Sequence, residues 1–293
     1  MKVAYFTAGT VGAGHLVRGI AVGKGLERAG FRGAYRMFGP PLPFPLACRR
    51  EDYQAVEIFG DRSLRDRRLA PTSDLARRLT EFAPDLLVVD LFWAPLYWLL
   101  PALGCAAWLL VRTCPPVWLV GPPEAPFPAQ QFDRIVGIEP VAYPAVAETI
   151  DPIVVANPDE LRPAGDLRQR FGIPLGGELV VVLHAGERGE AAVLRDAAAA
   201  ERPLTLDLFE PGALFPAAVW LSGADRIVSG AGYNAYWEAR WLGHAGRTTF
   251  VPFRRSIDDQ ARRLTAFGDY SPRVNGADTL AGWIVGSTRR RGT

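Results

Sequence analysis

Short runs of apolar residues recur along the chain, and most of them end at a glycine, a proline or a charged residue. The clearest runs are residues 2–7, 86–90, 179–183 and 224–229. Runs that are apolar at nearly every position are typical of strands buried on both faces of a parallel sheet. Segments with helical spacing of leucine separate several of these runs, as in 61–82. The pattern therefore predicts an α/β protein.

The stretch from Ala224 to Arg263 has the clearest organisation. A short strand leads into Gly230-Ala231-Gly232, which allow the chain to turn with little steric cost, and a helix over Tyr233–Leu242 follows. A second strand covers Arg247–Val251 and leads into an acidic loop. A glycine turn of this kind exposes backbone N–H groups at the positive end of the helix. The turn is therefore suited to binding a phosphate or a diphosphate.

Carboxylates lie at two places in this stretch where a nucleotide sugar could use them. Glu238 is about a turn and a half into the helix, where a carboxylate can accept two hydrogen bonds from a vicinal diol such as a ribose. Asp258, Asp259 and Gln260 follow the next strand and would face the same crevice. We expect their side chains to hold sugar hydroxyls.

A resemblance to GT-B glycosyltransferases, above all to the MurG-like group, rests on four segments of this stretch. The resemblance implies two Rossmann-like domains facing each other across a cleft, and a nucleotide diphosphosugar as donor, for which we expect a UDP-sugar. In that group the glutamate holds the ribose, and the Asp-Gln pair contacts the donor sugar. The segments are Ser229-Gly230-Ala231-Gly232, Glu238, Val251-Pro252-Phe253 and Asp259-Gln260.

A second glycine-rich loop, Gly9 to His15, follows the N-terminal strand. A dinucleotide fingerprint would need a third glycine where Val17 stands, and the strand near 33–38 has no acidic residue for a ribose. Both features argue against an NAD-dependent enzyme. The loop instead resembles the histidine-bearing loop of MurG-like proteins. The resemblance implies that Gly12 and Gly14 lie near the diphosphate, on the acceptor side of the cleft.

His15 and Asp90 are the candidate catalytic residues. His15 opens a helix whose positive end favours the neutral imidazole, and a neutral imidazole could take a proton from an acceptor hydroxyl. The alternatives are a diphosphate contact or a ring that only braces the loop. Asp90 ends the strand 84–90 at the edge where α/β proteins bind ligands, and could equally cap a helix over 93–103. Arg18, one turn later, could face the same cleft, but a position on the solvated face of its helix is the favoured interpretation.

The loop after the strand 179–183 is the third candidate contact with the diphosphate. MurG-like proteins carry a loop of small residues at this position. Gly186 matches that character, whereas His184 and Glu187 depart from it. Arg188 is a candidate phosphate ligand, because a guanidinium can bind two phosphate oxygens at once.

We expect two domains, an acceptor-side domain over residues 1–156 and a nucleotide-sugar domain over residues 157–293. The second is shorter than in the MurG-like group, so we expect it to lack a strand-helix pair. The terminal helix, residues 276–291, is expected to cross back to the first domain, as the last helix of GT-B folds often does.

Composition and charge exclude some classes of partner. The formal net charge is only +2, so a nucleic-acid partner is not expected. Cys48, Cys105 and Cys114 form no CxxC pair, which fits a reducing cytoplasm and predicts no metal site. No signal-peptide pattern is visible at the start.

The segment Leu86–Val111 is long enough to cross a bilayer and contains a single charged residue, Asp90. Pro95, Pro101 and Gly104 divide it into short pieces. We therefore interpret it as a buried strand, a helix and a second buried strand. A shallow contact of its aromatic residues with the inner face of the membrane is the alternative, because MurG-like enzymes act on lipid-linked acceptors.

The expected reaction is the metal-independent transfer of a sugar from a nucleotide diphosphosugar to an acceptor hydroxyl. Helix amides and arginines would offset the charge of the leaving diphosphate. Two alternatives stay open: a nucleotide-sugar hydrolase or epimerase of the same fold, and a non-catalytic protein that binds a nucleotide sugar or a partner glycosyltransferase. No motif selects the base, the sugar, the acceptor, the stereochemical outcome or the oligomeric state.

Overall fold

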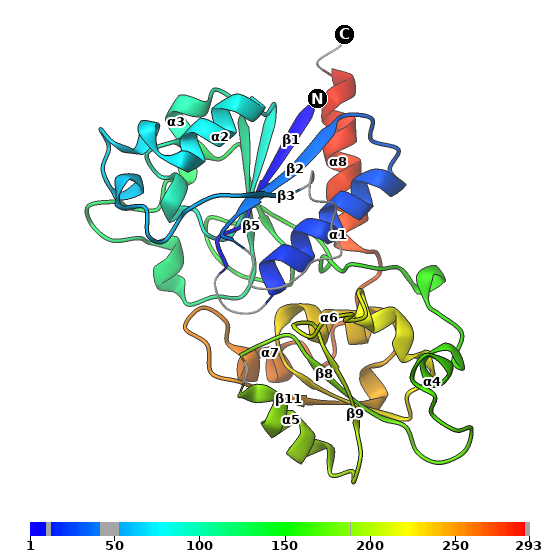
Figure 1. Cartoon of the computed structure of the whole chain (residues 1–293). Helices are drawn as coiled ribbons and strands as arrows, with labels where there is room; N and C mark the ends of the chain where they lie inside the picture. Colours follow the sequence, from blue (N-terminus) through cyan, green and yellow to red (C-terminus); the bar gives the residue numbers. More distant parts are fainter. Residues whose placement is uncertain (10–12, 42–52, 188, 291–293) are drawn as a thin grey trace.

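The computed structural model describes residues 1–9, 13–41, 53–187 and 189–290, which form two parallel sheets with helices around them (Figure 1). The first sheet has seven strands in the order β3-β2-β1-β4-β5-β6-β7. The second has four strands in the order β11-β10-β8-β9. The predicted α/β architecture with two Rossmann-like units is confirmed, and the second unit is the smaller one.

The strands of the first sheet are β1 (Lys2–Phe6), β2 (Ala34–Gly39), β3 (Tyr53–Ala55), β4 (Leu86–Asp90), β5 (Ala106–Val111), β6 (Arg134–Gly137) and β7 (Glu148–Thr149). Those of the second sheet are β8 (Val180–His184), β9 (Leu204–Asp207), β10 (Arg226–Gly230) and β11 (Thr248–Val251). The helices are α1 (Gly14–Arg28), α2 (Asp74–Phe82), α3 (Leu100–Leu103), α4 (Asp166–Phe171), α5 (Glu190–Ala198), α6 (Tyr233–Trp241), α7 (Gln260–Ala266) and α8 (Gly276–Arg290).

The first sheet is buried on both faces, as its apolar runs predict. Side chains of a strand alternate between the two faces. Val3 and Tyr5 of β1 accordingly belong to the core cluster that contains α1 and α8, and Ala4 and Phe6 belong to the cluster that contains α2. Every strand pair in this sheet is parallel, so the loops that follow the strands all emerge at one edge.

The segment 86–111 folds as two buried strands joined by short helical turns. The expected helix over 93–103 is not continuous: a single 3-10 turn, Ala94–Leu96, precedes α3. Pro95 and Pro101 account for the interruption, because proline removes a backbone donor and clashes with the preceding turn. In the part of the chain that the structure describes, no helix is long and apolar enough to cross a bilayer.

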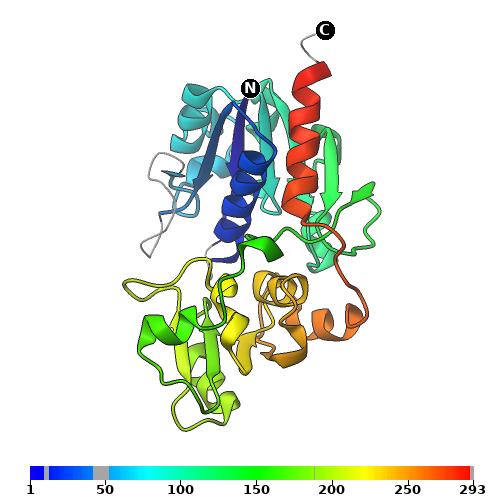
Figure 2. The same ribbon diagram turned by 90° about the vertical axis from the view of Figure 1, so that its right-hand side faces the viewer.

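The terminal helix α8 crosses back to the first unit and lies along α1 (Figure 2). Gly25 allows the close approach, because a Cβ at this position would lie 2.6 Å from the carbonyl oxygen of Ala277. Arg28 of α1 also donates to Asp278 of α8, with 2.7 Å between Nε and Oδ1. The expected return of the chain to its first unit is therefore observed.

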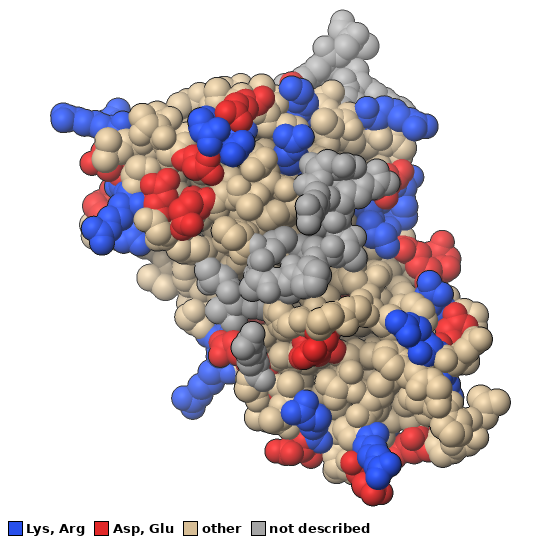
Figure 3. Space-filling model, viewed as in Figure 1, with Lys and Arg blue, Asp and Glu red and all other residues tan. Residues whose placement is uncertain are grey.

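One buried cluster joins the two units through α6, while the strands of the second sheet have buried clusters of their own. Tyr236 and Trp237 of α6 belong to the same buried cluster as Val136 and Ile138 of the first unit. The surface of the molecule contrasts with this core: on the face shown in Figure 3, basic and acidic side chains are interspersed. The described residues of that face form no continuous basic stripe of the kind that tracks a nucleic-acid backbone.

Candidate functional site

A cavity of about 450 Å³ opens between the carboxyl ends of the strands of the two sheets. Loops of the first unit line one side of it and loops after β8, β9 and β10 line the other. The carboxyl edge of a parallel sheet is where open α/β folds bind ligands, and the volume is within the range of small-molecule sites. The cavity is therefore the candidate site.

The turn between β10 and α6 lies at the centre of this cavity. Gly232 precedes the helix in an extended conformation, and no side chain caps the helix start. The first backbone N–H groups of an α-helix have no partner within the helix, and residues 232–235 line the cavity. A Cβ on Gly232 would meet only Nε2 of Gln260, at 3.7 Å. The turn thus offers open amides and free space, as an anion site requires.

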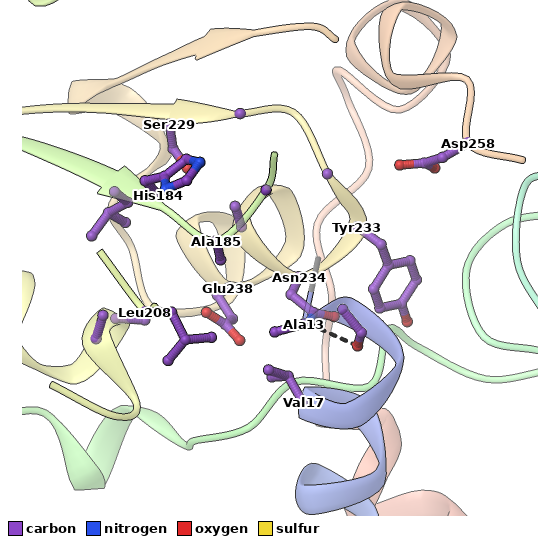
Figure 4. A pocket seen from close by; sticks show the side chains of 18 of the residues that line it. Ala13, Val17, His184, Ala185, Leu208, Ser229, Tyr233, Asn234, Glu238 and Asp258 are labelled. Carbon is purple, nitrogen blue, oxygen red and sulfur yellow. Dashed lines mark hydrogen bonds between the residues drawn. The ribbon is translucent and has the colours of Figure 1, made fainter. Parts of the chain in front are cut away.

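Glu238 points into the same cavity from the next turn of α6, with Leu208 on one side of its carboxyl group and Ala13 and Val17 on the other (Figure 4). Burial in these surroundings raises the pKa of Glu238 to about 8. Among the described residues, none donates a hydrogen bond to the carboxyl group of Glu238. Buried carboxyl groups normally have a hydrogen-bond partner in the protein. Because the carboxyl group of Glu238 has none among the described residues, it can accept hydrogen bonds from a ligand.

The loop after β8 is held by polar contacts of its own. Nδ1 of His184 lies 2.9 Å from Oδ2 of Asp207, and its Nε2 lies 2.9 Å from the carbonyl oxygen of Glu187. Gly186 lines the cavity, and a Cβ there would lie 2.0 Å from Oε2 of Glu190. A side chain at this position would therefore have to displace the carboxylate of Glu190 that covers Gly186.

Glu190 itself occupies the start of α5. Its Oε2 accepts a hydrogen bond of 3.2 Å from the backbone N–H of Glu187, and its Oε1 pairs with Arg255 from the loop after β11. Arg255 also lies 3.7 Å from a carboxylate oxygen of Glu187. The predicted phosphate ligand Arg188 lies outside the described residues, as does Gly12.

The two predicted catalytic residues, His15 and Asp90, are in contact, and Arg18 joins them. Arg18 is 2% exposed, so the favoured solvated position is wrong: the residue lines the cavity and binds both oxygens of Asp90 at 3.0–3.3 Å. Helical spacing alone could not show this, because Asp90 comes from a distant strand. The side chain of Asp90 therefore contacts Arg18 and His15. Among the described residues, none of its side-chain hydrogen bonds caps the helical turns that follow β4.

The protonation states of this cluster follow from burial and charge. Burial is the main cause that lowers the pKa of His15 to about 4; Asp90 partly offsets it, and Arg18 adds to it. Burial alone would raise the pKa of Asp90, but Arg18 and His15 outweigh it and hold the pKa far below its usual value. At neutral pH the cluster thus contains a carboxylate, a guanidinium and a neutral imidazole.

Aromatic side chains line the first unit's side of the cavity. The ring of Phe92 lies edge-on to His15, with 5.0 Å between centroids, and edge-on to Trp118 at 5.6 Å. All three side chains line the cavity. This side therefore combines one polar ring with an apolar wall.

In the acidic loop after β11, some side chains line the cavity and others make contacts within the protein. Gln260 lines the cavity and accepts a hydrogen bond of 2.9 Å from the backbone of Phe253. Asp259 is exposed, does not line the cavity, and caps α7 by accepting from the backbone N–H of Arg262 at 2.9 Å. Its neighbour Asp258 lines the cavity in its place.

Asp258 belongs to a buried network of charges that joins the two units and that sequence reasoning missed. Arg112 of the first unit binds its Oδ1 at 2.8 Å, and Arg263 of α7 binds the same atom at 2.6 Å. Arg263 also lies 3.4 Å from Glu139, which accepts from the indole N–H of Trp237 at 2.7 Å. Each of these charged side chains is at most 10% exposed.

The remaining predicted residues lie around α6. Gly14 begins α1, and its carbonyl oxygen accepts a hydrogen bond of 3.0 Å from Asn234 (Figure 4). Ser229 and Gly230 end β10 and line the cavity. The carbonyl oxygen of Ala231 accepts from Arg263 at 3.1 Å. The structure thus brings most of the predicted site residues to one cavity.

Comparisons with known proteins concern the fold. No protein-family model matches the chain, and no curated protein does. Solved structures match nearly its whole length. The spinosyn forosaminyltransferase SpnP is 16% identical, with a TM-score of 0.58 over 97% of this chain and 89% of its own. Phytolacca americana UGT2, complexed with UDP-2fluoro-glucose and pterostilbene, is 12% identical, with a TM-score of 0.53 over 97% and 90%.

The fold is GT-B. Acinetobacter baumannii MurG also matches, at 15% identity and a TM-score of 0.49 over 99% of this chain and 92% of its own. The GT-B resemblance that the motifs predicted is confirmed by these structural matches. Identities this low support the fold alone, so the activity has to be argued from the site.

Proposed function

We propose that this GT-B protein transfers a glycosyl group from a nucleotide diphosphosugar to a hydroxyl group of an acceptor. The observation that carries the proposal is the unpaired carboxyl group of Glu238, which faces the same cavity as the uncapped start of α6. In this proposal the α6 amides bind the diphosphate, and Glu238 accepts hydrogen bonds from the ribose. Gln260 then lies where the donor sugar would be.

The acceptor would bind against the first unit. Phe92 and Trp118 supply an apolar wall there, and His15 supplies the polar group beside it. A similar structure, UGT2, is complexed with UDP-2fluoro-glucose and pterostilbene. As part of the proposal, we take a UDP-sugar as the donor to be tested first and an organic molecule that fits the apolar wall as the acceptor.

A non-catalytic nucleotide-sugar binder is the second candidate, and one observation favours it. The carboxylate of Glu190 covers Gly186, in the loop where the MurG-like resemblance expects a diphosphate contact. If this anion keeps the diphosphate away from this loop, α6 and Glu238 could still bind a nucleotide sugar, but the loop would not stabilise the leaving diphosphate. Binding without turnover of UDP-, TDP- or GDP-sugars over a panel of acceptors would support this second function.

Glu238→Ala is expected to weaken UDP binding about 10- to 100-fold. The substitution removes two hydrogen bonds between a carboxylate and the ribose, and each such bond contributes about 1.5 kcal/mol or less in a site of this kind. Isothermal titration of UDP against the wild type and the variant measures the loss. Glu201→Ala, which removes an exposed glutamate, is the matched control and should leave the affinity unchanged. Equal affinity of wild type and Glu238→Ala would exclude the ribose role.

Gly232→Val is expected to weaken UDP binding far more than uridine binding. The backbone of Gly232 is extended and the space for a Cβ is open, so the variant should fold. The branched side chain would, however, fill the place that the proposal gives to the diphosphate. Titrations with uridine, UMP and UDP separate the two effects. A parallel loss for all three ligands would indicate general damage to the domain and would contradict a diphosphate site at this turn.

A further inference from the structure

His15 has two neighbours that make opposite demands on one of its ring nitrogens. Nη2 of Arg18 lies 2.7 Å from Nδ1, and Oδ2 of Asp90 lies 3.0 Å from the same atom. In a neutral imidazole Nδ1 carries either a proton or a lone pair. A proton on Nδ1 could be donated to Asp90, whereas a lone pair on Nδ1 could accept a hydrogen bond from Arg18. Only one of the two contacts can therefore be a hydrogen bond.

The chemistry of Arg18 decides between the two states. A guanidinium has no acceptor atom and keeps its charge, so it can only donate. A proton on Nδ1 would set two N–H groups against each other at 2.7 Å. Asp90 has no comparable need of the histidine, because Arg18 already contacts both of its oxygens at 3.0–3.3 Å. The lone pair on Nδ1 therefore gives the shorter contact, from Arg18, its hydrogen bond; the contact of Nδ1 with Oδ2 of Asp90 at 3.0 Å is then not a hydrogen bond, and Asp90 is held by Arg18.

We infer that Arg18 is a positioning residue for His15: by donating to Nδ1 it holds the ring as the Nε2–H tautomer, which presents a proton, and not a lone pair, to the cavity. Burial supports the neutral form of the ring, since the pKa of His15 is lowered to about 4. Nε2 has no hydrogen-bond partner among the described residues, and the side chain lines the cavity. The free N–H is thus available to a ligand.

The ligand that suits this N–H is an anionic oxygen such as that of a phosphate. The carbonyl oxygen of Gly14, the residue before His15, accepts a hydrogen bond of 3.0 Å from Asn234 in the first turn of α6, and the side chains of His15 and Asn234 line the same cavity. His15 therefore stands beside the helix start whose amides can bind an anion. The identity of this oxygen rests on the proposed function, whereas the tautomer does not. In this state the ring cannot take a proton at Nε2, so it differs from the general base that the sequence suggested.

The tautomer can be measured on the free, full-length protein. Long-range proton–nitrogen correlation spectra of the ¹⁵N-labelled chain at pH 7 distinguish a protonated from an unprotonated ring nitrogen, and the spectrum of His15→Gln identifies the signals of His15. We expect a proton on Nε2 and none on Nδ1. A proton on Nδ1, or on both nitrogens, would overturn the inference. Arg18→Met should move the proton to Nδ1, where Asp90 is then the remaining partner; an unmoved proton would remove Arg18 from this role.

A pair of variants tests the donor role without relying on Arg18→Met to fold. The amide nitrogen of glutamine can take the place of Nε2, whereas that of asparagine reaches only as far as Nδ1. Titration with inorganic pyrophosphate should therefore give His15→Gln an affinity within about threefold of the wild type, and His15→Asn a loss of about tenfold or more. Equal losses would contradict the donor role. A wild type that binds no pyrophosphate would overturn the anion site and the proposed function, while the spectra would still decide the tautomer.

Discussion

Arg263→Met is expected to destabilise the folded protein by about 3–5 kcal/mol, the largest effect on stability that we predict for a single side chain. Arg263 is fully buried and lies between Asp258 and Glu139. Methionine matches its length but not its charge. Two carboxylates would then share less positive charge in the protein interior, and an uncompensated buried charge is far more costly than the intact pair is stabilising.

The control for this prediction is Arg262→Met on the same helix. Arg262 is exposed, so its replacement should change the free energy of unfolding by at most about 0.5 kcal/mol. Urea unfolding followed by circular dichroism measures both variants. A loss below about 1 kcal/mol in Arg263→Met would show that Arg112 and Trp237 compensate the two carboxylates without it. Arg263→Met combined with Glu139→Gln should recover part of the loss, because Glu139 loses its arginine in Arg263→Met whereas Asp258 keeps Arg112, and glutamine removes the charge of Glu139.

The fold could be predicted from the sequence wherever the signal is local. Residues 86–89 are continuously apolar and predict a buried strand that closes at Asp90, and β4 covers this range. The helix predicted over 233–242 was bounded by glycines on both sides, and α6 covers Tyr233–Trp241. The helix expected over 93–103 was wrong, because two prolines outweighed its apolar spacing.

The site residues, too, could be predicted only where the signal is local in the sequence. Glu238 and the turn before α6 could be found because they lie on one continuous segment, and the strand, turn and helix fix their relative positions. The buried position of Arg18 could not be predicted, because its partner Asp90 is 72 positions away. The helical spacing of α1 does not distinguish a buried arginine from a solvated one. The same holds for Arg263, whose partner Glu139 is 124 positions away.

For Asp258 and Asp259, the sequence could not predict which of the two side chains lines the cavity. Both adjacent carboxylates were expected to face the cavity, and the resemblance assigned the contact with the donor sugar to Asp259. In the structure Asp259 caps α7, while Asp258 lines the cavity and binds two arginines. The choice depends on where α7 begins, and helix ends are the least certain part of any sequence-based assignment.

Glu238→Gln is expected to stabilise the free protein above about pH 8 and to leave its stability unchanged near pH 4. The pKa of Glu238 is raised to about 8 in the folded protein by burial, whereas a glutamate in an unfolded chain titrates near 4.5. Between these values the unfolded state loses this proton and the folded state keeps it. The wild type therefore loses stability as the pH rises from about 4.5 to 8. Glutamine does not titrate, so the variant avoids this loss.

The difference between the two proteins isolates this one group, because all other titrations are common to both. We expect Glu238→Gln to be about 2 kcal/mol more stable at pH 8.5, since one pKa unit corresponds to about 1.4 kcal/mol and partial contact with solvent reduces the full effect. Thermal unfolding of both proteins at pH 4, 6 and 8.5 measures it. A constant difference across this range would show that Glu238 titrates normally. Saturating UDP should shrink the difference at pH 8.5, because ribose hydroxyls that donate to the carboxylate stabilise its ionised form.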